Sequence, residues 1–192
     1  MAYKGMFFKK VKPTSIKEAS WWEEMCVRRQ GGYDLDQSNL PAGLKWLPKG
    51  AVVKLDTRGK AVVIKSAKVT EKALSSDKTV KLSAGSLYKE GDTIGGKEIA
   101  SIVRAESGDT VTLATELDTE LAAGTIVTDY DKSKDILLGF AYATKELDPD
   151  AAQVVEPTLR VMEVEEDSLP YPINSDIKEG LNANGIALFK IQ

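Results

Sequence analysis

Alternating hydrophobicity over residues 51–66 is the feature that most restricts how this chain can fold. The apolar runs AVVKL and KAVVIKS flank a short polar segment, DTRG, which ends in Gly59. Side chains of a β-strand point alternately to its two faces, so this pattern buries one face of each strand. Glycine supplies the positive φ that a bulged hairpin turn requires. Residues 51–66 therefore predict a β-hairpin.

Further apolar runs separated by turn residues predict strands along most of the remaining chain. Pro157 lies inside one of them, which indicates an edge position or a break. Residues 115–123 are either a short helix or a long loop, ended by Gly124. The predicted strands cover residues 79–84, the two arms of 97–114 around a turn at Gly108–Asp109, and residues 125–130, 136–147, 153–167 and 186–191.

A short helix is predicted before the last of these strands. Asn174 or Ser175 is placed to cap its N-terminus, and Gly185 is placed to end it. Ile177 and Leu181 are four residues apart, so they share one face of the helix and are expected to point inward.

A second helix is predicted after Pro13. Ser15 and Glu18 have the spacing of a capping box, and Gly31 with Gly32 follows a basic last turn. Apolar residues recur at helical spacing at Ile16, Ala19, Trp22 and Cys26.

Trp21 and Trp22 are neighbours, so on a helix they would lie about 100° apart and could not share a narrow face. Two arrangements are open. One tryptophan packs on the body while the other reaches outward as a contact anchor, or both lie in a broad core face.

The segment before this helix, MAYKGMFFKKVKP, is basic and aromatic and contains no acid. Residues 1–30 have a net charge of +4, whereas the other 162 residues have a net charge of −7. So short a segment does not fold alone, and FFKKV is either a strand added to a partner's sheet edge or a strand of the protein's own sheet. The candidate partner-binding residues are Tyr3, Phe7, Phe8, Lys9, Lys10, Trp21 and Trp22.

These patterns predict a mainly β fold with few short helices, in the α+β class. Its body would be a β-sandwich or barrel-like, with an extended N-terminal arm and one N-terminal helix. Three parts are expected: an arm and amphipathic helix at 1–45 that binds a partner, a β-rich hairpin domain at 46–130, and a β domain with a short C-terminal helix at 131–192.

Composition argues against an enzyme. The sequence has no histidine and one cysteine, Cys26. This removes Ser-His-Asp and Cys-His nucleophiles, histidine bases and histidine-ligated zinc. We therefore expect no catalytic residue, no cofactor and no metal.

Two segments approach ligand-binding motifs without completing them. GDTIGGKE, residues 91–98, has the spacing of a phosphate-binding P-loop, but Glu98 stands where the motif needs a hydroxyl. The segment is better explained as a glycine-rich β-turn. DYDKSKD resembles half of an EF-hand loop, but Lys134 and Phe140 replace the required glycine and glutamate, which favours a solvated acidic turn.

Neither a membrane nor nucleic acid is expected as a partner. No apolar run approaches the ~20 residues of a membrane span, and the first residues lack the apolar stretch of a signal peptide. An acidic body disfavours phosphate backbones. A single cysteine suits synthesis in a reducing cytoplasm.

Five motifs in residues 135–192 resemble the head-decoration protein family of tailed bacteriophages, of which the lambda protein is the best known. They are LLGFAYAT, LRVMEV, the Leu-Pro turn DSLPYPI, the short helix IKEGLNANG and the closing strand IALFKI. The segments YKEGDTIGG, IASIVRAESGDTVTLATEL and AAGTIV are similar to another recurring module of phage virions. Within these proteins, the chain most resembles an auxiliary capsid or head-fibre-base protein of crAss-like phages that infect Bacteroides.

The resemblance implies a non-enzymatic role on the outer surface of the capsid. The expected partners are the major capsid protein, other virion proteins such as head fibres, and further copies of the chain, with a trimer as one arrangement. The arm would carry the contact, so deleting residues 1–12 should weaken capsid binding and leave the body folded.

The alternative is a β-rich module or fibre anchor that binds a carbohydrate or host surface. In that case Trp46, Tyr88 or Tyr171 would stack on sugars.

Overall fold

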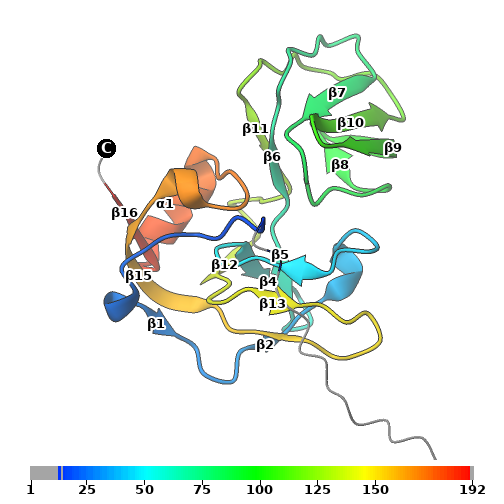
Figure 1. Ribbon diagram of the computed structural model, residues 1–192. Helices are drawn as coiled ribbons and strands as arrows, with labels where there is room; N and C mark the ends of the chain where they lie inside the picture. Colours follow the sequence, from blue (N-terminus) through cyan, green and yellow to red (C-terminus); the bar gives the residue numbers. More distant parts are fainter. Residues whose placement is uncertain (1–12, 14, 191–192) are drawn as a thin grey trace, which may run out of the picture.

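The computed structural model describes residue 13 and residues 15–190 of the chain. Strands account for 37% and helix for 10% of it, which confirms the predicted mainly β fold class. Figure 1 shows two parts, with β6 and β11 side by side where the chain passes between them. We call residues 66–128 the hairpin lobe, and residues 15–64 together with 129–190 the main body.

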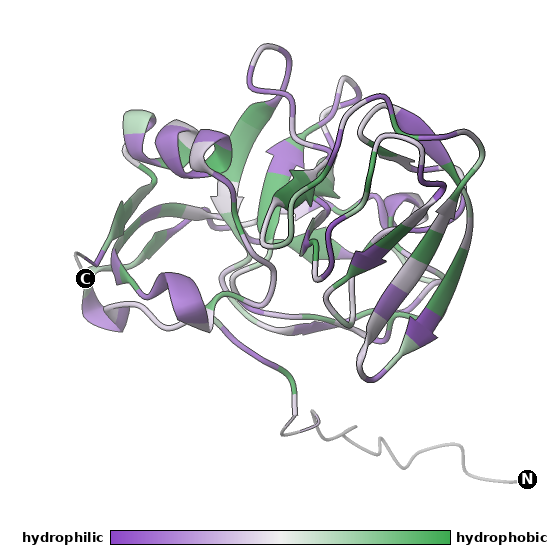
Figure 2. Ribbon diagram, turned by 90° about the horizontal axis from the view of Figure 1, so that it is seen from above, coloured by the Kyte–Doolittle hydropathy of each residue, from purple (hydrophilic) through white to green (hydrophobic). Residues whose placement is uncertain are grey.

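The hairpin lobe is built from antiparallel pairs of strands. Four strands form a sheet in the order β7–β10–β9–β8, and β6 pairs with β11. Hydrophobic and hydrophilic residues alternate along strands in Figure 2, as the sequence predicts. The segment 115–123, for which helix and loop were both open, is a loop. The strands are β6 (Ser66–Lys68), β7 (Thr79–Leu82), β8 (Thr93–Ile94), β9 (Lys97–Ala105), β10 (Gly108–Leu113) and β11 (Ile126–Thr128).

The main body is assembled from segments on both sides of the lobe. Its sheets are β12–β4–β5, β13–β3, β14–β2 and β1–β15–β16, and each joins strands from the two sides. Before the lobe come η1 (Glu23–Met25), β1 (Val27–Arg28), β2 (Tyr33–Asp34), η2 (Gln37–Asn39), β3 (Trp46–Leu47), β4 (Val52–Leu55) and β5 (Ala61–Val63). After it come β12 (Ile136–Phe140), β13 (Lys145–Glu146), β14 (Val154–Val155), β15 (Thr158–Val164), η3 (Glu166–Ser168), α1 (Ser175–Ala183) and β16 (Ala187–Phe189).

The grouping of the core differs from the predicted boundaries at 45/46 and 130/131. β4 and β5 pair with each other and with β12, and their side chains lie in the cores of the main body. One separate core, formed by residues between 67 and 127, belongs to the hairpin lobe. The lobe is therefore an insertion between β5 and β12, and Leu87 reaches from it into a main-body core.

Local predictions within the main body are confirmed. The β4–β5 hairpin closes at Gly59, which has a φ of +79°. The Asn174 side chain accepts a hydrogen bond from the Ile177 N–H at 2.9 Å and caps α1, while Ile177 and Leu181 are wholly buried. Pro157 separates β14 from β15, so it marks a break.

The helix predicted over residues 15–29 is not formed, and that prediction was wrong. This segment contains only the short 3-10 turn η1 and the two-residue strand β1. The Ala19 N–H donates to the Lys49 carbonyl at 3.1 Å, and the Trp22 N–H donates to the Met162 carbonyl at 3.0 Å. These long-range bonds use the donors that a helix would use internally, so tertiary pairing overrides the helical spacing.

Candidate interaction sites

The segment GDTIGGKE contains β8 and the tight turn at Gly95–Gly96 that joins β8 to β9. Gly95 and Gly96 have φ values of +58° and +77°, a conformation that costs other L-residues about 1–2 kcal/mol. A strand, β9, follows directly where a phosphate-binding loop has a helix. Lys97 pairs with Asp118 at 2.8 Å. The prediction of a structural β-turn is confirmed.

The aspartates of DYDKSKD are held by groups of the protein itself. Lys134 at 2.8 Å, with the Ser133 hydroxyl and N–H at 2.6 and 2.9 Å, keeps the pKa of Asp131 well below its usual range. Asp135 pairs with Lys54 at 2.8 Å. In the part of the chain that the structure describes, no group of three or more His, Cys, Asp or Glu is placed to hold a metal.

A buried cluster of charges lies where the chain crosses between the main body and the hairpin lobe. Lys65 is 1% exposed and donates from Nζ to both carboxylate oxygens of Asp92 at 2.6 Å. Its backbone N–H donates to Asp129 Oδ1 at 2.8 Å. Burial lowers the pKa of Lys65 and raises that of Asp129. The cluster joins the outgoing and returning strands of the lobe and is structural.

The three aromatic residues proposed to stack on sugars have different surroundings. Tyr88 is wholly buried, so the prediction that it could face a sugar was wrong. Tyr171 packs against a main-body core, and burial raises its pKa. Trp46 lines a pocket.

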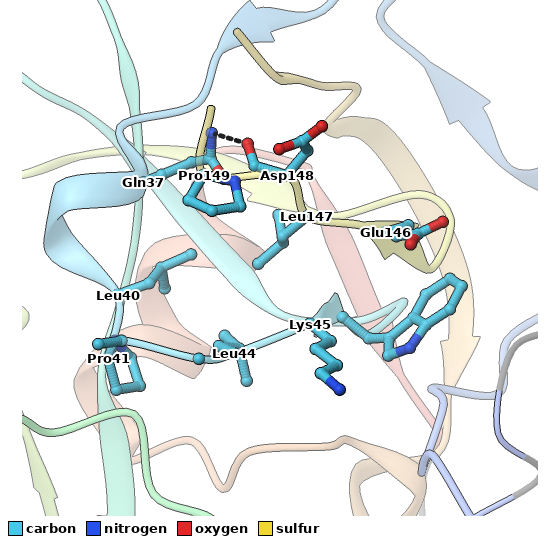
Figure 3. A pocket seen from close by; sticks show the side chains of 12 residues that line it. Gln37, Leu40, Pro41, Leu44, Lys45, Glu146, Leu147, Asp148 and Pro149 are labelled. Atoms are coloured by element: carbon cyan, nitrogen blue, oxygen red, sulfur yellow. Dashed lines mark hydrogen bonds between the residues drawn. The ribbon is translucent and has the colours of Figure 1, made fainter. Parts of the chain in front are cut away.

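This pocket has a volume of about 730 Å³ and lies beside the β3–β13 pair. Its walls come from Gln37, residues 40–46 and residues 146–149. Figure 3 shows Leu40 and Leu147 pointing toward each other across it. Gln37 Nε2 donates to the carbonyls of Asp148 and Ala151 at 3.0 and 2.9 Å, which ties η2 to the loop after β13. The sequence analysis missed this pocket because its two walls are about a hundred residues apart in the chain.

The predicted partner-binding residues are separated by the structure. Trp21 and Trp22 alternate as in an extended chain: Trp21 is 6% exposed in a core, and Trp22 is 45% exposed. Of the two arrangements left open, the one with a single outward tryptophan is correct. The other candidates, Tyr3, Phe7, Phe8, Lys9 and Lys10, lie outside the residues that the structure describes.

Trp22 is one of several exposed apolar residues on or next to the sheet β1–β15–β16. Leu159 and Leu188 each follow a buried strand residue, so their side chains point away from the core. Five of the eight exposed large hydrophobic residues of the described chain lie on this sheet or in the segment leading into it. We call these five the outer face: Trp22, Met25, Val27, Leu159 and Leu188.

A shallow pocket of about 340 Å³ lies beside Trp22, with Glu163, Glu165 and Lys190 among its walls. Glu163 has a φ of +54°, and the pairing of β15 with β16 shifts register at this point. Such an irregularity changes the direction of the side chains on a strand. The outer face therefore combines apolar side chains with a charged border.

Comparison with known proteins does not assign this chain to a family. No family model, curated protein or solved structure matches it. The resemblance to phage decoration proteins therefore stays a prediction from its motifs. Among the described residues, no helix has the length and apolar character needed to cross a membrane.

Proposed function

We propose that this chain is a structural virion protein that binds the outer surface of a bacteriophage capsid and stabilises it. It would act as a decoration or auxiliary capsid protein without catalysing a reaction. Its partners would be the major capsid protein and neighbouring virion proteins such as head fibres. Copies of the chain would form a homo-oligomer on the capsid, for example a trimer.

The observation that carries this proposal is the outer face. Five of the eight exposed large apolar side chains of the described protein lie on one sheet or in the segment leading into it, and clusters of such side chains mark interaction surfaces. Tryptophan is enriched among the residues that contribute most to binding energy. On a capsid, many copies would each contribute a modest contact, and multivalency would turn these into firm attachment.

The test is co-sedimentation of the purified protein with capsids, or with shells of the major capsid protein, over a range of concentrations. Trp22→Ala should weaken binding by about 2 kcal/mol, or about thirtyfold in Kd, as expected for a central tryptophan. Trp22 is 45% exposed, so its removal should leave the fold intact.

Val103→Ala is the matched control, because Val103 is 66% exposed on β9 in the hairpin lobe. It should bind like the unmodified chain. Equal binding by Trp22→Ala and Val103→Ala would remove the outer face as the contact. An unmodified chain that does not sediment with capsids would overturn the proposed function itself.

A further inference from the structure

The pocket beside the β3–β13 pair has the chemistry of a site for apolar side chains. Three leucines, two prolines and Trp46 make up half of its twelve wall residues. The Nε2 of Gln37 already donates to two carbonyls, so its N–H groups are not free to donate to a sugar hydroxyl. A volume of about 730 Å³ falls in the range of ligand sites, ~300–1,000 Å³.

The border of this pocket is acidic. Glu146 and Asp148 stand among its wall residues against one cation, Lys45. Asp150 follows in the same loop. A segment that enters the pocket should therefore be apolar and positively charged.

The N-terminal arm has this composition. Phe7 and Phe8 are adjacent, Met6 precedes them, and the arm contains four lysines and no acid before Pro13. Aromatic side chains supply the burial that the pocket offers, and the lysines match its acidic border.

The arm also joins the main body close to the pocket. Glu18 accepts a hydrogen bond from Thr144 Oγ1, and the Ala19 N–H donates to the Lys49 carbonyl. Thr144 is two residues from Glu146, and Lys49 is three residues from Trp46. Phe8 lies ten positions before Glu18, which gives a reach of up to about 33 Å at ~3.3 Å per residue.

We propose that the Phe7–Phe8 segment docks into the pocket of its own chain. Attachment to the body gives the segment a local concentration near the millimolar range, so a weak apolar contact is enough to fill the site. The inference does not depend on the capsid role. If the arm also contacts a capsid, it must leave the pocket to do so, since the same side chains cannot occupy both places.

Disulfide trapping in the full-length chain tests the docking. In a Cys26→Ser background, Lys9→Cys is combined with Ala42→Cys, which places one thiol beside the two phenylalanines and one on the pocket wall. The control combines Lys9→Cys with Ala105→Cys, an exposed position at the end of β9 in the hairpin lobe. In a glutathione buffer, the pocket pair should form an intramolecular disulfide at least tenfold more readily than the control pair.

Two outcomes of the trapping experiment would overturn the proposal. Equal trapping of the pocket pair and the control pair would show that the arm has no preference for the pocket. Disulfide-linked dimers in place of linked monomers would show that the pocket receives the arm of a second copy.

Trypsin provides a second measurement, because Lys9 and Lys10 follow the docked segment directly. Cleavage at these lysines should be at least about fivefold faster after Phe7→Ser/Phe8→Ser, which removes the apolar anchors. Ala42→Trp, which adds a bulky ring to the pocket wall, should have the same effect, and Ala105→Trp should not. If Phe7→Ser/Phe8→Ser accelerates cleavage and Ala42→Trp does not, the arm docks at a place other than the pocket. If the full-length chain binds a glycan at the pocket and Phe7→Ser/Phe8→Ser leaves that binding unchanged, the arm does not occupy the pocket.

Discussion

The charge cluster at the crossing between the two parts gives the sharpest stability prediction. The Lys65 ammonium is almost wholly buried and donates to both oxygens of Asp92, whose side chain is 17% exposed. Lys65→Met keeps most of the aliphatic volume, so it removes the charge without opening a large cavity.

Breaking a buried ion pair from one side costs about 3–5 kcal/mol, because the remaining charge is left without its partner. The Asp92 carboxylate keeps some contact with solvent and a hydrogen bond from the Lys89 N–H at 2.7 Å. The lower end of the range therefore applies, about 3 kcal/mol. For a chain of this length that corresponds to a fall in Tm of about 6–12 °C.

The assay is urea denaturation followed by circular dichroism, with the slope m checked for constancy. Lys68→Met is the control, because Lys68 is exposed on β6 three residues away, and it should change stability by less than about 0.5 kcal/mol. Adding Asp92→Asn to Lys65→Met should recover stability, because it removes the unpaired charge and keeps an acceptor for the Lys89 N–H. Equal stability of Lys65→Met and Lys68→Met would refute the reasoning.

The same residue predicts a pH dependence. Burial lowers the pKa of Lys65 below its ordinary 10.5, although Asp92 opposes the shift. Between the lowered pKa and 10.5 the unfolded chain binds more protons than the folded one at this site, so its contribution to stability rises with pH. Lys65→Met lacks this contribution. The difference in free energy of unfolding between the unmodified chain and Lys65→Met should therefore be larger at pH 10 than at pH 8. A constant difference would contradict the lowered pKa of Lys65.

Three further predictions concern the turns and one crowded glycine. Lys97→Ala should change the free energy of unfolding by no more than about 0.5 kcal/mol, because the lysine pairs only with an exposed partner. If the unmodified chain binds ATP or GTP and Lys97→Ala abolishes that binding, the segment is a nucleotide site and not only a structural turn. Millimolar Ca²⁺ should not raise Tm, and a rise of several degrees that Asp131→Ala removes would establish a calcium site. Gly139→Ala should cost at least about 3 kcal/mol in chemical denaturation, since its φ is +128° and a Cβ would lie 2.2 Å from a backbone oxygen. Gly59→Ala, at a φ of +79° with open space, should cost only about 1–2 kcal/mol, and equal losses would exclude crowding as the cause.

Elements specified by adjacent residues could be predicted from the sequence. The β4–β5 hairpin follows from the alternation around Gly59, and α1 follows from Asn174 with Ile177 and Leu181. In each case the turn or cap and the apolar spacing lie within about fifteen residues. Local backbone geometry then determines the element before any distant contact forms.

The segment around Trp21 and Trp22 could not be predicted in this way. Its apolar spacing fits a helix, but Lys49 and Met162 offer backbone acceptors that only the folded main body brings within reach. Those bonds make the segment extended, and the extended chain in turn buries Trp21 and exposes Trp22. Tertiary pairing therefore determines which tryptophan is a candidate contact.

The sequence by itself determined the β-rich class, the hairpins, the short helix and the contrast between a basic arm and an acidic body. Tertiary structure alone decided that the hairpin lobe is an insertion and that a pocket forms between residues 40–46 and 146–149. It also decided that the outer-face residues lie on β1–β15–β16 or in the segment leading into that sheet. The physical reason is the distance along the chain over which each effect acts. Alternation, caps and glycine turns act between near neighbours, whereas a sheet joining both sides of the lobe is specified only by complementary burial between distant segments.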